Sequence, residues 1–253
     1  MMELAGKTGI ITGGSSGLGF AAANVLAEAG AVVYAVSRSG RPKLEGETSH
    51  ENVIHLAADV SDYKEMGELT ERIGREHGID FLVNNAGITV KSLAQDVSDA
   101  DFEKVLQVNV SSVFKLCTLC YPYLRQSPNR GRIVNITSMA AHLGFSEVVP
   151  YCTSKGAVLS MTRGLAVDWA QDGINVNSVA PGWFPSEMSR KVMDEERKQK
   201  ILARMPVHCF GNPRDIGAMV KFLVSDESEY ITGQDFAVTA GFKLRLLAEE
   251  VMS

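Results

Sequence analysis

Two side chains capable of proton transfer, Tyr151 and Lys155, stand four residues apart in a segment with helical periodicity. Residues at this spacing emerge from the same face of a helix. A free phenol has a pKa near 10, and a shift of roughly two to three units lets it exchange a proton near neutral pH. An adjacent ammonium in a partly dehydrated site favours the phenolate. The pair therefore predicts general acid–base catalysis by Tyr151.

A hydroxyl group is expected beside this pair, because Ser138 follows the β-rich run 132–137 and precedes Tyr151 by thirteen residues. Ligands of open α/β sheets bind at the carboxyl ends of the strands, where Ser138 would lie. Its hydroxyl would donate a hydrogen bond to a substrate oxygen and stabilise charge that develops there. Each of these residues alone is more often structural, whereas their combination favours catalysis.

A glycine-rich turn, Thr12-Gly13-Gly14-Ser15-Ser16-Gly17-Leu18-Gly19, joins the apolar run 8–12 to an alanine-rich helical pattern. The N–H groups and the dipole at a helix N-terminus favour a bound pyrophosphate. This strand–turn–helix context favours nucleotide binding over an ordinary turn, and the lack of a P-loop lysine favours a dinucleotide over ATP. The cofactor-binding residues expected here are Gly13, Ser15, Ser16, Gly17, Leu18 and Gly19.

The same turn fits a second pattern, the G-x-S-x-G nucleophile elbow of α/β-hydrolases. A hydrolase needs an acidic residue and then a histidine downstream of the nucleophilic serine. His208 is the only histidine late in the chain, and it lies beside a charged, lid-like insertion. Hydrolysis is therefore the weaker alternative.

Seven apolar, β-rich runs would position these residues, at 8–12, 31–36, 52–57, 80–85, 132–137, 174–180 and 235–239. Segments with helical spacing lie between most of them, including 18–29, 63–77, 100–124 and 158–169. This alternation predicts a parallel sheet with helices on both faces. The polar stretch between Ser37 and Asn52 is expected to be a loop. The apolar face at Val158, Met161 and Leu165 could be buried within the monomer or pack against a partner subunit.

Composition and charge exclude several classes of protein. With 253 residues, 45% hydrophobic and 22% charged, the chain matches an ordinary globular protein and predicts one domain over 1–253. Its net charge of -5 is a poor match for nucleic acid. Four cysteines are too few for a secreted disulfide framework, and Cys117-x-x-Cys120 lacks a second pair at zinc spacing, so no metal is expected. Without a signal peptide or a run of ~20 apolar residues, we expect a cytoplasmic protein with no membrane partner.

Taken together, the motifs resemble those of the short-chain dehydrogenase/reductase family, in its compact single-domain branch. They are Thr12-Gly13-x-x-x-Gly17-x-Gly19, Asp59-Val60, Asn84-Asn85-Ala86-Gly87, Asn109, Ser138, Tyr151-x-x-x-Lys155 and Pro181-Gly182, and they span nearly the whole chain from Lys7 to Gly241. The resemblance implies an α/β, doubly wound Rossmann-type fold with a seven-stranded parallel sheet. It also implies a nicotinamide cofactor and the interconversion of a ketone and a secondary alcohol by hydride transfer.

The resemblance further implies individual roles. Lys155 would bind the nicotinamide ribose and lower the pKa of Tyr151, and Asn109 would help to hold a water that connects Lys155 to solvent. Thr239-Ala240-Gly241 stands where relatives often have Asp-Gly-Gly, in a region that the family uses in tetramer contacts. We expect a homo-oligomer, either a tetramer or a dimer, whose assembly this departure could alter.

The choice of cofactor depends on the end of the second strand. An acidic side chain there accepts from the ribose 2′-OH of NAD, whereas an arginine can pair with the 2′-phosphate of NADP. The chain has Ser37-Arg38 and no acidic residue at positions 34 to 41, which favours NADP(H), with NAD(H) as the alternative. Asp59 would accept from the adenine amine or cap a helix. The remaining residues expected along the cofactor are Val60, Asn85, Ala86, Gly87, Pro181 and Gly182.

By the same resemblance, segments 89–93, 140–150 and 183–188 bound the substrate pocket, with a lid at about 183–206. The substrate-contacting residues expected are Ser138, His142, Tyr151 and Trp183. Segment 138–144 is similar to that of gluconate-type and polyol dehydrogenases, which favours a sugar acid or polyol. A 3-oxoacyl thioester or a general carbonyl compound is the alternative substrate. The competing class is a non-catalytic NADP(H)-binding sensor or scaffold, which the presence of both Tyr151 and Lys155 disfavours.

Overall fold

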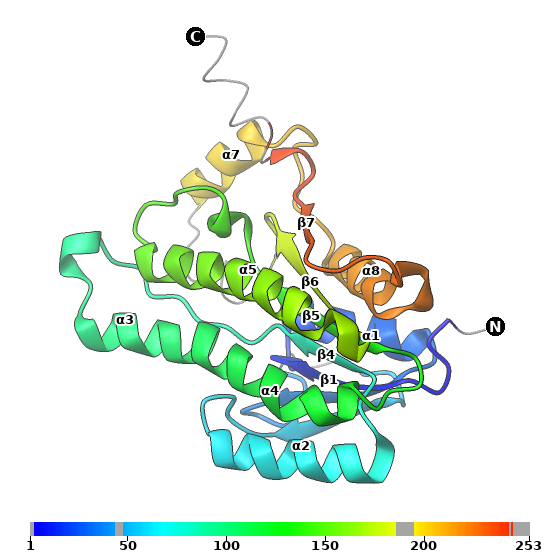
Figure 1. Ribbon diagram of the computed structural model, residues 1–253. Helices are drawn as coiled ribbons and strands as arrows, with labels where there is room; N and C mark the ends of the chain where they lie inside the picture. Colours follow the sequence, from blue (N-terminus) through cyan, green and yellow to red (C-terminus); the bar gives the residue numbers. More distant parts are fainter. Residues whose placement is uncertain (1–2, 44–47, 186–194, 243, 245–253) are drawn as a thin grey trace.

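The computed structural model of the protein describes residues 3–43, 48–185, 195–242 and 244. Within them the seven strands form a single parallel sheet, as predicted, and its strand order is β3-β2-β1-β4-β5-β6-β7 (Figure 1). Each strand begins and ends within one residue of its predicted run. The strands are β1 (Thr8–Thr12), β2 (Val32–Ser37), β3 (Val53–Ala57), β4 (Phe81–Asn84), β5 (Gly131–Ile136), β6 (Ile174–Pro181) and β7 (Asp235–Val238).

The strand order reverses beside β1, which pairs with β2 on one side and with β4 on the other. The chain builds outward from β1 to β3 and then crosses back to β4. In a doubly wound sheet the ligand crevice lies at this reversal, outside the carboxyl ends of the strands. The fold therefore places the turn after β1 and the segment after β4 on opposite sides of one crevice.

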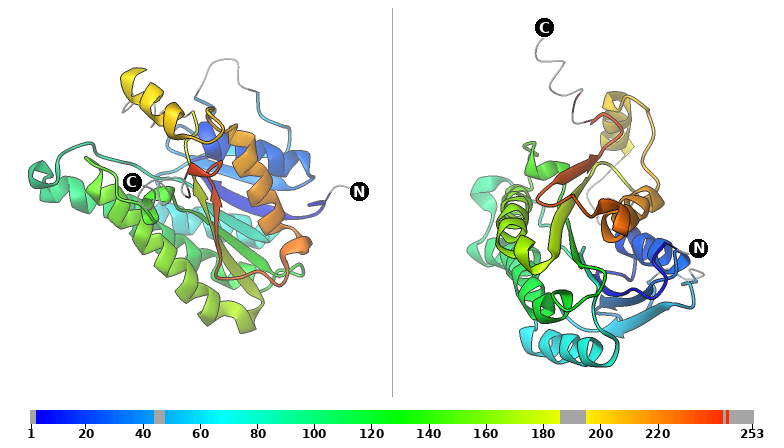
Figure 2. Two further views of the ribbon diagram at one scale, coloured as in Figure 1. Left: turned by 90° about the horizontal axis from the view of Figure 1, so that it is seen from above. Right: turned by 45° about the vertical axis from the view of Figure 1, so that its right-hand side comes forward.

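Helices cover both faces of the sheet (Figures 1 and 2). Successive residues of β1 point to opposite faces of the sheet and belong to two different hydrophobic cores. Ile10 is in the core formed with α2, α4 and α5, whereas Ile11 is in the core formed with α1 and α8. Val158 and Leu165 belong to the first of these cores, so the monomer itself buries that face of α5. The described helices are α1 (Gly17–Glu28), α2 (Tyr63–His77), α3 (Asp99–Leu106), α4 (Ser112–Leu124), α5 (Val149–Trp169), α7 (Glu195–Arg204) and α8 (Pro213–Val224).

Two expectations concern segments that are described only in part. No helix forms in the described residues between Ser37 and Asn52, as predicted, although 44–47 lie outside the described residues. This loop folds back over the glycine-rich turn, where the Lys43 N–H donates to the Ser15 carbonyl at 2.9 Å. The expected lid at 183–206 contains α7, while 186–194, with Met188, lie outside the described residues.

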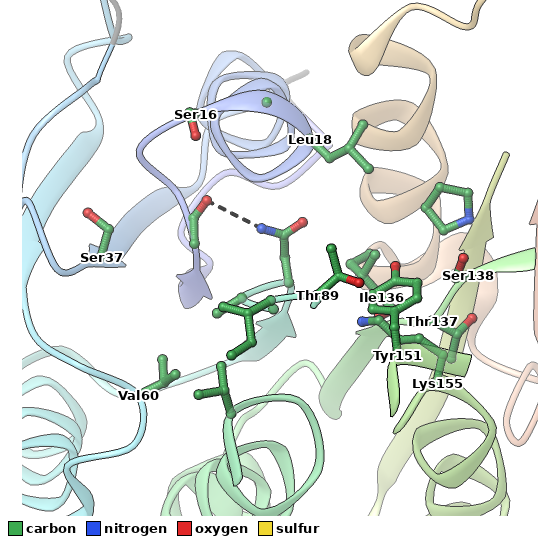
Figure 3. A pocket seen from close by; sticks show the side chains of 18 of the residues that line it. Ser16, Leu18, Ser37, Val60, Thr89, Ile136, Thr137, Ser138, Tyr151 and Lys155 are labelled. Atoms are coloured by element: carbon green, nitrogen blue, oxygen red, sulfur yellow. Dashed lines mark hydrogen bonds between the residues drawn. The ribbon is translucent and has the colours of Figure 1, made fainter. Parts of the chain in front are cut away.

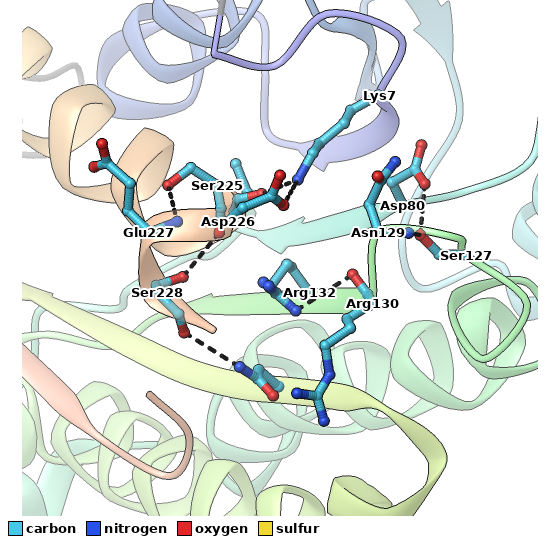
Figure 4. A network of polar contacts seen from close by, with 12 residues as sticks. Lys7, Asp80, Ser127, Asn129, Arg130, Arg132, Ser225, Asp226, Glu227 and Ser228 are labelled. Carbon is cyan, nitrogen blue, oxygen red and sulfur yellow. Dashed lines mark hydrogen bonds and ion pairs between the residues drawn. The ribbon is translucent and has the colours of Figure 1, made fainter. Parts of the chain in front are cut away.

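A polar network ties the strands together at their amino ends, away from the crevice (Figure 4). The Asp80 carboxylate accepts hydrogen bonds from the Thr8 N–H at 2.8 Å and the Ser127 hydroxyl at 2.6 Å. The buried Lys7 ammonium pairs with Asp226 at 2.6 Å. Because these partners are far apart in the sequence, the network joins β1, β4 and the segment after α8 into one base for the sheet.

Candidate active site

A cleft of about 460 Å³ opens at the carboxyl ends of the strands. Segments that follow β1 to β6 all contribute to its wall. In Figure 3, Ser37 and Val60 lie at one end of the cleft and Ser138, Tyr151 and Lys155 gather at the other. The predicted residues that line the cleft are Gly13, Ser15, Ser16, Gly17, Leu18, Ser37, Arg38, Asp59, Val60, Asn85, Ala86, Gly87, Ser138, Tyr151, Lys155, Pro181, Gly182 and Trp183.

The glycine-rich turn has the shape that a bound pyrophosphate requires. Gly13 and Gly17 have φ angles of +68° and +57°, in the region that favours glycine. Ser16 is the N-cap of α1, but its side chain makes no capping hydrogen bond among the described residues. The first N–H groups of α1 therefore remain available to an anion at the positive end of the helix dipole. This part of the cleft fits the diphosphate of a dinucleotide.

Gly19 lies behind this turn and does not line the cleft. A Cβ atom at Gly19 would collide with the Asn85 amide and the Gly13 carbonyl. The same amide donates to the Thr12 carbonyl at 2.9 Å. Gly19 thus lets the segment after β4 hold the glycine-rich turn, and its expected contact with the cofactor stays a prediction.

Positive side chains gather at the β2–β3 end of the cleft. Arg38 lines it as predicted, and Lys43 and Lys104 join it, which the sequence analysis missed. Hydrogen bonds from Ser61 lower the pKa of Asp59 below its ordinary value, and the charges of Arg38 and Lys104 act in the same direction. The Asp59 carboxylate accepts from the Ser61 N–H at 2.9 Å, while Asp62 is the N-cap of α2. Asp59 therefore caps the turn before α2 while it lines the cleft.

At the other end, the first turns of α5 carry Tyr151 and Lys155 on one face. The Lys155 ammonium lies 5.6 Å from the centre of the Tyr151 ring and donates to the Ile136 carbonyl at 2.7 Å. Desolvation lowers the pKa of Lys155 to about 8. Burial raises the pKa of Tyr151 above its ordinary value, and the Ser138 hydroxyl opposes that rise. In the protein without cofactor the net shift of the Tyr151 pKa is therefore upward, because desolvation of the phenolate is its largest cause.

Ser138 follows β5 in an extended conformation and is the N-cap of a 3-10 turn, Met139–Ala141. Its Oγ atom accepts from the Ala140 N–H at 3.1 Å. Because the backbone occupies an acceptor position, the hydroxyl hydrogen is left to donate toward the cleft, which Ser138 lines. This arrangement suits a hydrogen-bond donor to a substrate oxygen.

Asn109 does not line the cleft; it lies fully buried in a π-helical turn, Gln107–Ser111, between α3 and α4. Its side chain accepts from the Ile88 N–H at 2.8 Å and donates to the Ile88 carbonyl at 2.9 Å. It also donates to the Ser154 hydroxyl at 3.0 Å. The side chain therefore fixes the segment after β4 against α5. The predicted water-holding role of Asn109 stays a prediction.

Beyond Ser138, Tyr151 and Lys155, the substrate end of the cleft is lined by aromatic and apolar side chains and by two residues with unpartnered polar atoms. Trp183 packs edge-on against Phe145, with ring centroids 6.0 Å apart. Within the described residues, Trp183 Nε1 and Thr89 Oγ1 are buried without a hydrogen-bond partner, and both residues line the cleft. His142, predicted to contact substrate, does not line the cleft, because its Nε2 atom pairs with Asp235 at 2.6 Å.

Two further findings concern metals and membranes. The described residues contain no group of three or more His, Cys, Asp or Glu side chains that could hold a metal ion. Cys117 is buried, and burial raises the pKa of its thiol to about 12. A helix apolar and long enough to cross a bilayer does not occur in the described part of the chain.

Comparisons with known proteins agree with this geometry. Residues 13–243 match the family model described as enoyl-(acyl carrier protein) reductase. The chain is 36% identical over 242 residues to the 3-oxoacyl-acyl-carrier-protein reductase FabG of Rickettsia typhi, covering 95% of this chain and 98% of the relative. It is also 36% identical over 248 residues to the 2-dehydro-3-deoxy-D-gluconate 5-dehydrogenase of Dickeya dadantii, covering 96% of this chain and 98% of the relative. The crystal structure of a gluconate 5-dehydrogenase from Burkholderia cenocepacia, in complex with NADP and tartrate, is similar with a TM-score of 0.87 and 28% identity, over 96% of this chain and 97% of that chain.

Proposed function

The chain belongs to the short-chain dehydrogenase/reductase family of nicotinamide-dependent oxidoreductases that act on CH–OH groups, and from this premise we propose that it interconverts a ketone and a secondary alcohol with NADP(H). The observation that carries the proposal is the convergence of Ser138, Tyr151 and Lys155 at one end of the cleft whose other end fits a dinucleotide. A non-catalytic sensor would need the cleft but not this convergence.

In the proposed mechanism, Tyr151 protonates the carbonyl oxygen during reduction and removes the hydroxyl proton during oxidation. Ser138 donates a hydrogen bond to the same oxygen and stabilises the negative charge that develops on it. Lys155 holds the nicotinamide ribose and places a positive charge beside the phenol. When bound, the nicotinamide supplies or accepts the hydride, and the positive charge of its oxidised ring favours the phenolate. That charge would offset the burial that raises the pKa of Tyr151.

The preference for NADP(H) is supported by the cations at the β2–β3 end of the cleft. Arg38, Lys43 and Lys104 line that end, and Asp59, the acidic residue among the described residues that line the cleft, is engaged by Ser61. A guanidinium matches a phosphate with two parallel hydrogen bonds, and nearby ammonium groups add charge. The 2′-phosphate of NADP would meet these groups, whereas NAD offers a neutral hydroxyl there.

For the substrate, we propose an oxygen-rich ketone of the sugar-acid or polyol class. The unpartnered Trp183 Nε1 and Thr89 Oγ1 atoms support this, because a buried polar atom left without a partner costs free energy. A ligand oxygen would remove that cost once the substrate displaces the side chains that cover these atoms. The indole N–H can only donate, so its partner would be a carboxylate, hydroxyl or carbonyl oxygen. Relatives that act on gluconate derivatives and on 3-oxoacyl thioesters are equally similar in sequence, so the thioester is the alternative.

We also propose that the chain forms one domain and works as a homo-oligomer. Phe114, Val149 and Val167 are exposed apolar side chains on α4 and α5, with exposures of 50%, 43% and 79%, which a second copy could cover.

α7 belongs to the proposed lid, because Ile201 packs with Met139 beside Ser138. The four free cysteines support a reducing compartment such as the cytoplasm.

A carbonyl panel tests the function and the substrate class together. NADPH and NADH oxidation would be followed with keto-sugar acids, ketoses, 3-oxoacyl thioesters and simple cyclic ketones. We expect the first two groups to be preferred. Trp183→Phe, which removes only the N–H, and Thr89→Val, which replaces only the hydroxyl, should each lower kcat/KM about 10- to 100-fold for the preferred compounds. Neither substitution should alter the turnover of a simple cyclic ketone. If the wild-type protein prefers thioesters or unsubstituted ketones, the proposed substrate class is wrong.

A further inference from the structure

The carboxylate of Asp235, the first residue of β7, contacts one residue before Ser138 in the sequence and one residue after it. Its Oδ1 atom accepts from the Thr137 hydroxyl at 2.9 Å, and its Oδ2 atom pairs with His142 Nε2 at 2.6 Å. Thr137 immediately precedes Ser138, and His142 follows the 3-10 turn that Ser138 caps. These partners are 98 and 93 residues from Asp235 in the sequence. We propose that Asp235, Thr137 and His142 form a clamp, the Asp235 clamp, that positions the Ser138 hydroxyl for the reaction.

The chemistry of the clamp fixes its hydrogen bonding. An ionised carboxylate only accepts, so His142 must carry a hydrogen on Nε2, as the neutral tautomer or as the imidazolium. The side chains of His142 and Asp235 are only 19% and 6% exposed, so water competes little for this contact. Hydrogen bonds to an ionised group are shorter and stronger than those between neutral groups. The clamp is therefore stiff compared with an ordinary surface turn.

The position of Ser138 depends on the two segments that the clamp joins. The Thr137 hydroxyl lies within 3.0 Å of the Val179 carbonyl, so its one hydrogen is shared between β6 and Asp235. On the other side, the backbone N–H of His142 donates to the Met139 carbonyl at 3.0 Å and closes the 3-10 turn. Displacing either segment would rotate the Ser138 hydroxyl relative to Tyr151. Thr137, His142 and Asp235 would thus act through Ser138 as positioning residues. Thr137 itself also lines the cleft, whereas His142 and Asp235 are not among the described residues that line it.

Ser178 provides a matched control within the same cluster. Its hydroxyl also donates to Asp235 Oδ1, at 2.5 Å, but it lies on β6 and does not adjoin Ser138. Removing it takes one hydrogen bond from the same carboxylate while both sides of the Asp235 clamp remain. A merely structural role for the cluster predicts that kcat falls in step with the free energy of unfolding in Ser178→Ala and in His142→Leu alike.

The inference rests on the proposed role of Ser138, so the experiment includes Ser138→Ala. The probe is the panel ketone that wild type reduces fastest, and the readouts are kcat, KM, the Kd for NADPH and the free energy of unfolding. We expect His142→Leu and Thr137→Val to lower kcat about 10- to 100-fold with the Kd for NADPH unchanged. His142→Gln, which keeps an N–H donor, should recover most of the rate. Ser178→Ala should keep kcat within about twofold of wild type.

The outcomes separate the two proposals. If Ser138→Ala loses turnover while His142→Leu and Thr137→Val keep wild-type kcat, the clamp is wrong and the proposed function stands. Equal losses of kcat in Ser178→Ala and His142→Leu would also overturn the clamp. If Ser138→Ala keeps wild-type turnover, the proposed role of Ser138 fails and the clamp fails with it. Thr137→Val is nearly isosteric, so it decides the question if His142→Leu does not fold.

Discussion

The Lys155 ammonium lies 5.6 Å from the centre of the Tyr151 ring, and a 2.7 Å hydrogen bond to the Ile136 carbonyl holds it there. The lysine is thus anchored to the end of β5, the strand that Ser138 follows. Three groups with proposed catalytic roles therefore depend on the junction between β5 and α5.

Replacing Arg38 tests the choice of cofactor. Arg38→Ala should weaken NADPH binding about 10- to 100-fold and leave NADH binding nearly unchanged, because a charge-assisted contact to the 2′-phosphate is lost. Titration of the purified variant with each cofactor measures the two Kd values. Lys43→Ala and Lys104→Ala should show smaller losses with the same selectivity. Equal losses for NADPH and NADH would contradict the assignment.

A methyl group at Gly19 tests the cradle. Gly19→Ala should weaken cofactor binding about 10- to 100-fold, because the new Cβ would collide with the Asn85 amide and the Gly13 carbonyl. Gly164→Ala, on α5, is the matched control because no atom lies within 4 Å of its added Cβ. Cofactor titration of both variants is the measurement. Wild-type affinity in Gly19→Ala would show that the turn does not need this glycine.

The stability of the protein should depend on the protonation of Lys155. Its pKa is about 8, below the ordinary value of 10.5, because of desolvation. Between these values the unfolded chain holds a proton that the folded chain has released, so the free energy of unfolding rises with pH from about 8 to 10 and the gain is lost below 8. Relative to Lys155→Met, wild type should gain about 2 kcal/mol between pH 7 and pH 10.

Chemical denaturation of both proteins at pH 7, 8.5 and 10 measures this difference. Making the same comparison with Tyr151→Phe in both proteins removes the titration of Tyr151, which the loss of the neighbouring Lys155 charge would otherwise shift. Parallel stability curves for wild type and Lys155→Met would mean that the pKa of Lys155 is not lowered.

Asp80 tests the base of the sheet separately from catalysis. Asp80→Ala should destabilise the protein by about 2–4 kcal/mol, because the Thr8 N–H and the Ser127 hydroxyl lose their acceptor. Asp168→Ala removes an exposed carboxylate and should change the free energy of unfolding by less than about 0.5 kcal/mol. Urea denaturation gives both values. If Asp80→Ala changes the free energy of unfolding only slightly, the polar network around Asp80 does not stabilise the sheet as proposed. If the folded variant loses activity, this network also affects the active site.

Local patterns predicted the sheet and the placement of Tyr151 and Lys155 on one face of α5 well, and for a physical reason. Buried parallel strands are apolar on both faces, so their positions are visible in the sequence. The spacing of Tyr151 and Lys155 is a property of one helix, which needs no knowledge of the rest of the fold. Because the strands were located correctly, the predicted site residues at their carboxyl ends line the cleft.

Contacts between distant segments could not be predicted. Lys43 and Lys104 enter the cleft from a loop and a helix 61 residues apart, and neither belongs to a motif. The pairing of His142 with Asp235 joins residues 93 apart, so no local pattern indicated it, and the expected contact of His142 with substrate stays a prediction. The effect of burial on Tyr151 likewise depends on the packed structure, which is why its pKa is raised where the pair alone predicts a lowering.

The proposed role of Tyr151 is tested most directly by Tyr151→Phe, which removes only the phenolic hydroxyl. The measurement is the rate of NADPH oxidation with the preferred ketone, alongside the Kd for NADPH. We predict that turnover falls at least about 100-fold, the lower end of what a general acid contributes, while the Kd stays within about twofold of wild type. Turnover close to wild type, with NADPH bound normally, would contradict the assignment of Tyr151 as the proton donor.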